Sequence, residues 1–173
     1  VQAVAALAGP GARLLWGPEA ATRAALLSLS EGGGLRGLGA LHLATHARLA
    51  HDAPSRSALL LADGDLTLYD ILNLDLAAGV VTLSACDGAT GRALGGNELM
   101  SLAWAWLQAG ARTVVASLWP VADEHAVALM AEFYGRLPLH APGPWPPGTV
   151  AAALAGAQDA RRARGAPLHA WAP

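Results

Sequence analysis

The chain has 173 residues, of which 54% are hydrophobic and 14% charged, with a formal net charge of −2 and one cysteine. This length suffices for one domain with a full-sized core, and the near-neutral charge gives no electrostatic basis for binding nucleic acid or an anionic membrane surface. One cysteine excludes an internal disulfide and a multi-cysteine zinc site. A lone thiol suits a reducing compartment, so we expect a cytoplasmic protein. We also expect that its chemistry needs no metal or other cofactor.

The longest apolar region, 99–122, does not have the pattern of a membrane span. It contains Gln108, Gly110 and Arg112 near its middle, and an arginine at the centre of a bilayer costs on the order of 2.5–3.5 kcal/mol. A helix, a turn and a buried strand explain the same residues. No signal peptide is visible. The chain does not begin with methionine and ends at Ala172-Pro173, so we expect 1–173 to be a single domain cut from a longer protein.

The first third of the chain predicts a strand, a helix and a second strand. Residues 12–17 form a short apolar run closed by glycine, and a helix is expected over 20–30, with Pro18 at the first helical position. A glycine-rich loop over 31–39 follows. The strand over 40–45 is apolar almost throughout, as expected for a strand covered on both faces.

The next region predicts a hairpin. A polar loop over 47–56 leaves the strand that precedes His46. Segments 57–62 and 66–68 are apolar and flank Asp63-Gly64, which is a strong short-range signal for a hairpin.

A helical turn over 69–73 leads into a second buried strand over 79–84 and a glycine-rich loop over 87–96. Beyond this loop the pattern predicts three helices and one strand. They are a helix over 98–109 capped by Asn97, a strand over 111–119, a helix over 123–137 capped by Asp123, and a helix over 149–164. This alternation predicts an α/β fold with a mainly parallel sheet between two layers of helices and one β-hairpin insert.

Two of the predicted strands end in residues that can do chemistry. The run 80–84 leads to Cys86, and the run 40–45 leads to His46. Ligands of open parallel sheets bind beyond the carboxyl ends of the strands, and neighbouring strands lie about 4.8 Å apart. A free cysteine is most often a small buried hydrophobe, but this thiol follows the apolar run instead of lying within it. The pair therefore predicts a cysteine–histidine dyad.

Such a dyad has a defined chemistry. An unperturbed thiol has a pKa of about 8.5, and a neighbouring imidazole increases its thiolate fraction at neutral pH. The thiolate attacks a carbonyl, and the histidine protonates the leaving amine. The backbone N–H groups at Ala47 and Cys86 are candidates for binding the oxyanion. His42 shares the strand face of His46, and we expect it to be a satisfied core residue or to face a helix.

The sequence resembles caspase-like cysteine peptidases. His46 and Cys86 are 40 positions apart, against roughly 50 in caspases, and 84–88 shares an Ala-Cys-x-Gly pattern with the caspase signature. A closer resemblance is to the CHAT family, bacterial caspase-like domains often joined to tetratricopeptide repeats. The stretches that carry it are 41–47, 57–61, 66–74, 80–88, 97–119 and 123–137.

The resemblance implies a caspase-like three-layer sandwich and a hydrolase with His46 and Cys86 as its dyad. The substrate implied is a protein with an extended cleavage segment, and the regulator implied is a set of repeats or a partner protein outside this segment. The segment Ser117-Leu118-Trp119 would border the substrate groove, where a peptide can pair with the strand edge. Trp119 can equally pack under Pro120.

Asp87 also has two interpretations. It can shape a pocket for a basic substrate side chain, or it can bond to turn amides.

Two departures from the family keep an alternative open. The family usually has glycine after the histidine, where this chain has Ala47, which keeps the N–H but restricts φ. Residues 168–172 resemble the start of the closing strand of the family, and the segment ends there. The alternative is a catalytically inactive caspase-like module used for binding or signalling. A third hypothesis, a nucleotide-binding domain, is weak because 91–96 fits neither dinucleotide nor P-loop spacing.

Overall fold

The computed structural model describes residues 2–50, 53–86, 96–117, 119, 121–141 and 145–172, with backbone only at 54, 85–86 and 96–101. The strands are β1 (Arg36–Arg48), β2 (Ala58–Leu61), β3 (Gly64–Thr67), β4 (Ala77–Cys86) and β5 (Val114–Ala116). The helices are α1 (Gln2–Ala8), α2 (Arg23–Glu31), α3 (Leu68–Leu72), α4 (Gly96–Ala109), α5 (Asp123–Tyr134), α6 (Thr149–Ala163) and α7 (Leu168–Trp171). Short 3₁₀ turns occur at Gly9–Gly11 and Pro54–Arg56.

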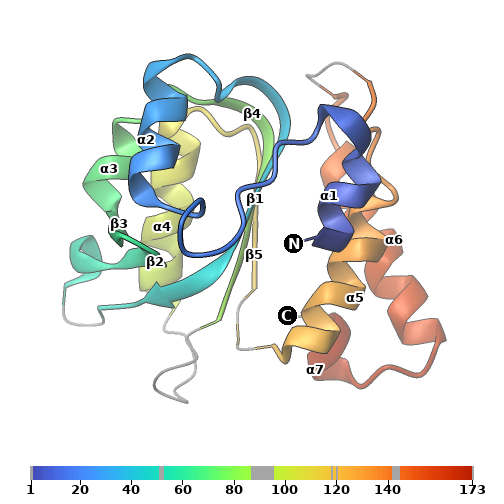
Figure 1. Ribbon diagram of the computed structural model, residues 1–173. Helices are drawn as coiled ribbons and strands as arrows, with labels where there is room; N and C mark the ends of the chain where they lie inside the picture. Colours follow the sequence, from blue (N-terminus) through green and yellow to red (C-terminus); the bar gives the residue numbers. More distant parts are fainter. Residues whose placement is uncertain are drawn as a thin grey trace.

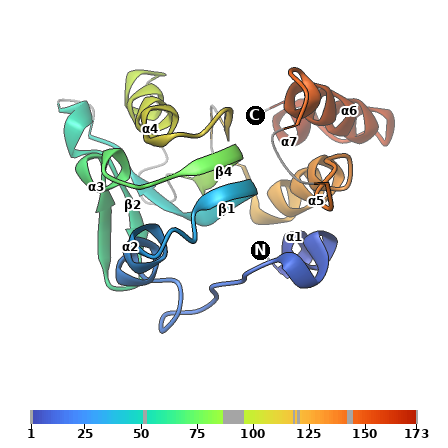
Figure 2. The same cartoon turned by 90° about the horizontal axis from the view of Figure 1, so that it is seen from above.

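The strands form one sheet in the order β3-β2-β1-β4-β5, with helices on both faces (Figure 1). Seen from above, α2, α3 and α4 lie on one face, and α1, α5, α6 and α7 lie on the other (Figure 2). The predicted three-layer α/β architecture is therefore present.

The prediction of a mainly parallel sheet is corrected. The pairs β1–β4 and β4–β5 are parallel, whereas β1–β2 and β2–β3 are antiparallel, so the sheet is mixed. The reason is the length of β1, which continues past His46 to Arg48 and there pairs with β2. The hairpin thus extends the sheet instead of lying outside it.

Side chains of β4 point alternately to the two faces of the sheet and contribute to a separate hydrophobic core on each face. Val81 packs into a core under α2, α3 and α4 that includes Trp106, whereas Val80 packs into a core with Phe133 and Tyr134 of α5. All five side chains are almost fully buried. A strand covered on both faces is apolar on both, which is why this run lacks the polar alternation of a surface strand.

Several predicted elements are wrong. Residues 12–16 form no strand; in this segment Leu14 and Trp16 are exposed and pair with no neighbouring strand. The predicted closing strand over 168–172 is the short helix α7, and the strand over 111–119 is reduced to β5 and one bridge between Ala111 and Ala78. An apolar run becomes a strand only where a partner lies beside it.

Helix ends agree more closely with the predictions. The predicted hairpin, the α3 turn and α6 are present within one or two residues of the expected bounds. Asn97 lies inside α4 instead of capping it, and Asp123 is the first residue of α5, where its charge suits the helix dipole. Gly110 ends α4 with φ +118°, and a Cβ atom there would lie 2.0 Å from the carbonyl oxygen of Leu76, so only glycine fits.

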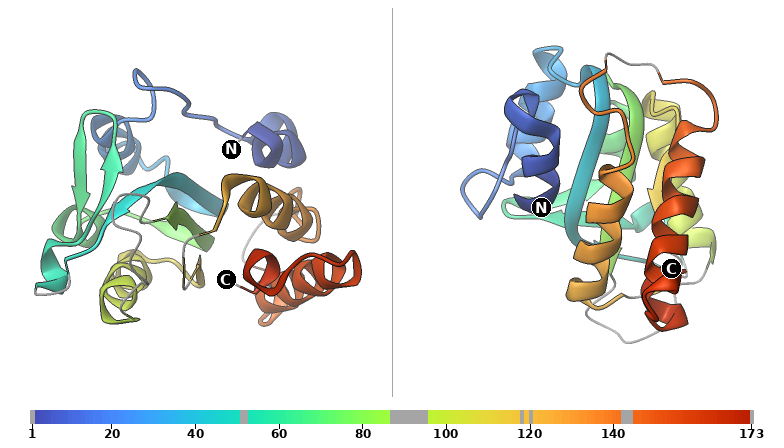
Figure 3. Two further views of the ribbon diagram at one scale, coloured as in Figure 1. Left: turned by 90° about the horizontal axis from the view of Figure 1, so that it is seen from below. Right: turned by 90° about the vertical axis from the view of Figure 1, so that its right-hand side faces the viewer.

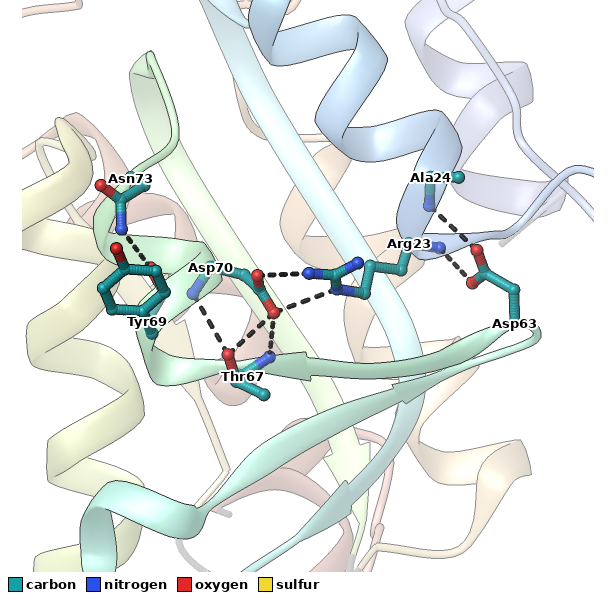
Figure 4. A network of polar contacts seen from close by, with 7 residues as sticks. All are labelled: Arg23, Ala24, Asp63, Thr67, Tyr69, Asp70 and Asn73. Atoms are coloured by element: carbon teal, nitrogen blue, oxygen red, sulfur yellow. Dashed lines mark hydrogen bonds and ion pairs between the residues drawn. The ribbon is translucent and has the colours of Figure 1, made fainter.

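The hairpin is fastened to α2 by a charged network (Figure 4). Asp63, in the turn between β2 and β3, accepts hydrogen bonds from the backbone N–H groups of Arg23 and Ala24 at the start of α2. The Arg23 guanidinium donates two hydrogen bonds to Asp70, at 3.1 and 2.6 Å. Asp70 also forms a capping box with Thr67 at the start of α3. These contacts hold β2 in place beside the last residues of β1.

Candidate active site

The two residues that the sequence singles out lie side by side in the sheet. The parallel register of β1 and β4 runs from Ala40 opposite Val80 to His46 opposite Cys86. Neighbouring strands are about 4.8 Å apart, so the backbones of His46 and Cys86 lie at that spacing. Cys86 is the last residue of β4, and the imidazole of His46 is exposed. The structure thus brings both positions to the same end of two adjacent strands.

A pocket with a volume of about 280 Å³ lies on this face of the sheet, next to His46. Its floor is formed by β1 and by Ser84 of β4, and its walls by α5 and α1. In the right-hand view of Figure 3, β1 is visible between α1 and α5, which lie on the viewer's side of the sheet. The lining residues are Ala3, Val4, His42, Ala44, Thr45, His46, Ser84, Asp123, Ala126, Val127 and Met130.

The inner end of this pocket is held by a chain of neutral hydrogen bonds. The hydroxyl of Tyr134 donates to Oγ1 of Thr82 at 2.8 Å, and Nδ1 of His42 lies 3.2 Å from the same hydroxyl. The rings of His42 and Tyr134 meet edge to face, with centroids 5.4 Å apart. As expected, His42 faces a helix.

Burial makes both ring groups at the inner end uncharged. It lowers the pKa of His42 to about 4 and raises the pKa of Tyr134 to about 12, because a low-dielectric surrounding disfavours each charged form. At neutral pH the pocket therefore ends in a neutral imidazole and a neutral phenol.

Ala47, a predicted oxyanion donor, lies inside β1 and not in a turn. It is buried and pairs with Leu59 of β2. Within the described part of the chain no residue other than glycine has a positive φ. Alanine therefore meets no steric penalty at the position where the resembling family has glycine.

The predicted substrate-groove residues are only partly described. Ser117 follows β5 and lines a small, mostly apolar pocket of about 50 Å³ with Ser84 and Val121. Trp119 is half-buried, and its indole N–H donates to the carbonyl oxygen of His169 at 3.3 Å. This contact favours a packing role for Trp119, although its partner is α7 instead of Pro120. Leu118, Asp87 and the side chain of Cys86 lie outside the described residues.

Two further findings concern the described residues only. They contain no group of three or more histidine, cysteine, aspartate or glutamate side chains arranged to hold a metal ion. They also contain no helix long and apolar enough to cross a membrane.

A family model for the CHAT domain matches residues 1–173, which is the whole chain. The chain belongs to the CHAT family. This membership confirms the resemblance predicted from the sequence and relates the chain to caspase-like cysteine peptidases. No curated protein matches the sequence significantly.

Sequence reasoning identified His46 as a site residue, but it assigned His42 to the core or to a helix contact and so missed the inner end of the CHAT domain pocket. The alternation of 42, 44 and 46 places His42 and His46 on one strand face, and that signal is visible in the sequence. The partner of His42 is Tyr134, 92 positions later, and the partner of Tyr134 is Thr82. No local pattern links these three side chains, because they meet only after α5 has packed onto the sheet.

Proposed function

We propose that this CHAT domain is a cysteine endopeptidase in which Cys86 is the nucleophile and His46 is the general base and acid. The observation that carries the proposal is the register of the sheet, which pairs His46 with Cys86 at the end of β4. His46 is exposed beside the pocket, so a substrate can reach it from solvent. Metal-free thiol chemistry needs no further group to begin the reaction.

The proposed reaction has two steps. The imidazole of His46 takes the proton of the Cys86 thiol, and the thiolate attacks the peptide carbonyl to form a tetrahedral oxyanion. Backbone N–H groups at Cys86 and Ala47 are the proposed donors to that oxyanion. The C–N bond then breaks, and the imidazolium protonates the leaving amine. Water hydrolyses the resulting thioester and releases the acid product.

The proposed substrate is a protein with an extended segment that lies along the sheet edge. In the described part of the chain β5 is the last strand on its side of the sheet, with no strand paired to its outer edge. An edge strand can accept a peptide as an added strand. We propose a cytoplasmic setting and control by repeats or a partner protein, consistent with a lone thiol that requires reducing conditions.

The test is cleavage of a proteome-derived peptide library, read by mass spectrometry. Wild-type protein is expected to generate new termini, and Cys86→Ala and His46→Ala are each expected to lower the rate by about 10³-fold or more. Tyr69→Ala serves as a control, because Tyr69 is exposed on α3, on the face of the sheet away from the pocket. A Cys86→Ala protein that cleaves at the wild-type rate would contradict the proposal.

One observation favours the alternative of an inactive binding module. Residues 168–171 form α7, whose His169 holds the indole of Trp119, so this helix lies beside the segment proposed to border the groove. The two functions differ in the reactivity of Cys86. An active dyad is expected to alkylate with iodoacetamide faster than a free thiol at pH 6, in a manner that His46→Ala abolishes. An inactive module is expected to react at the free-thiol rate or more slowly.

A further inference from the structure

We propose that the pocket between β1 and α5 binds the substrate side chain on the acyl side of the scissile bond, and that His42 selects a neutral hydrogen-bond donor there, the hydroxyl of tyrosine. This inference rests on the proposed peptidase function, because it places the mouth of the pocket beside the reacting pair. It adds a specificity residue that takes no part in the bond-breaking steps.

The hydrogen-bond chain determines which nitrogen of His42 is available. The Tyr134 hydroxyl donates to Thr82, and with that direction its oxygen accepts from His42. We therefore assign the proton of the neutral His42 ring to Nδ1. Nε2 is left with a lone pair, and among the described residues no partner accepts or donates at that atom. Nε2 of His42 is not among the fully buried, unpaired side-chain atoms of the described residues, so this atom remains accessible to solvent.

The shape of the pocket suits one long side chain. His46 lies at its mouth and His42 at its inner end, four residues apart on one strand, which corresponds to about 13 Å. Ala44 lies between the two rings and leaves the space open. The volume of about 280 Å³ is below the roughly 300–1,000 Å³ of ordinary ligand pockets. A single side chain, and not a cofactor, is the occupant of matching size.

The lining chemistry favours an aromatic body with a polar tip. Val127 and Met130 of α5 and Val4 of α1 supply apolar walls. A phenyl ring gains from burial against these walls, and the tyrosine hydroxyl needs a partner where it is buried. Nε2 of His42 is the acceptor that we propose for the hydroxyl group at that tip.

Charged side chains fit less well. The acidic residue among those that line the pocket is Asp123, the first residue of α5, and its side chain is exposed. His42 and Met130 line the inner end. A lysine or arginine that reached His42 would bury its charge without a counter-ion, which is strongly unfavourable. A carboxylate would face the lone pair of Nε2 and be repelled. A neutral donor is therefore the class that the pocket accepts.

The first experiment measures cleavage of matched fluorogenic peptides, acetyl-Ala-Ala-Ala-X-aminomethylcoumarin, with X as Tyr, Phe, Arg or Asp. Tyr and Phe differ only in the hydroxyl group, so their ratio isolates the proposed hydrogen bond. We expect kcat/KM for Tyr to exceed that for Phe by about tenfold or more, and Arg and Asp to be poorer than Phe.

Variants of the hydrogen-bond chain sharpen this test. His42→Leu is expected to reduce the Tyr-to-Phe ratio to within about twofold of one, and His42→Gln, which keeps an acceptor, to restore part of it. Tyr134→Phe removes a positioning residue and is expected to lower the ratio without any contact to substrate. His125→Leu is the matched control, because His125 lies on α5 but contacts His169 of α7 at a ring-centroid distance of 5.8 Å. Its ratio is expected to equal that of wild type.

A binding assay separates this inference from the proposed function. Cys86→Ala protein is titrated with acetyl-Ala-Ala-Ala-Tyr-amide and its Phe counterpart by calorimetry. Absent cleavage together with tighter binding of the Tyr peptide, lost in Cys86→Ala/His42→Leu, would overturn the peptidase proposal and support the pocket. Cleavage with equal rates for Tyr and Phe, or a preference for Tyr that persists in His42→Leu, would overturn the pocket and leave the peptidase proposal standing.

Discussion

Two polar networks on opposite faces of the sheet differ in character. Towards the hairpin, Arg23, Asp63 and Asp70 form a charged network whose members are partly exposed. Towards α5, His42 and Tyr134 form an uncharged chain with Thr82, largely withdrawn from water. The charged network joins α2 to the hairpin turn and to α3 and so fastens one element to another. The neutral chain leaves one nitrogen unpaired, and that is why it can recognise a ligand.

Removing the carboxylate of Asp70 is the most direct way to break the fastening network. Asp70→Ala leaves the Arg23 guanidinium without its partner and removes the capping box of α3. We expect a loss of about 2–3 kcal/mol in the free energy of unfolding, measured by urea denaturation. Asp75→Ala is the control, because the Arg36–Asp75 pair is exposed on both sides and is expected to contribute little to the free energy of unfolding. Equal effects of the two substitutions would contradict this ranking.

The neutral chain is expected to respond to mild acid. The pKa of His42 is lowered from 6.5 to about 4 in the folded protein, so the unfolded chain binds a proton at a higher pH than the folded chain does. The contribution of neutral His42 to the free energy of unfolding is fully present above about pH 6.5 and is lost as the pH falls from about 6.5 to 4. After allowance for partial exposure, we expect this loss to be on the order of 2 kcal/mol. Denaturation curves between pH 7 and 4 measure this loss. A His42→Leu protein with the same loss would show that another group causes it.

The charged network is expected to respond only to stronger acid, and less. Its hydrogen bonds with Arg23 lower the pKa of Asp70 from 3.8 to about 2, so its contribution is present above pH 3.8 and is lost as the pH falls towards 2. The expected loss is about 1 kcal/mol, because Arg23 is partly exposed and water screens the pair. Thermal unfolding of wild type and Asp70→Asn between pH 5 and 2 measures it. Parallel pH profiles for the two proteins would show that Asp70 does not titrate in this range.

Local patterns predicted most of the elements around the candidate site. The apolar runs before His46 and Cys86, the turn at Asp63 and the helix that ends at Gly110 were all readable, because burial, tight turns and helix ends impose composition on neighbouring residues. The wrong predictions concern segments whose structure depends on a neighbouring strand. Residues 12–16 and 168–172 have strand-like composition, yet no strand runs beside them. The length of β1 was underestimated because pairing with β2 extends it to Arg48.

Short motifs in a fixed order were enough to predict the family, the α/β class and the two residues proposed to carry the chemistry. The folded chain was needed to show that the sheet is mixed, that His46 is the register partner of Cys86 and that His42 meets Tyr134. Register and packing are pairwise properties of segments distant in the chain, and a local pattern specifies only one member of each pair.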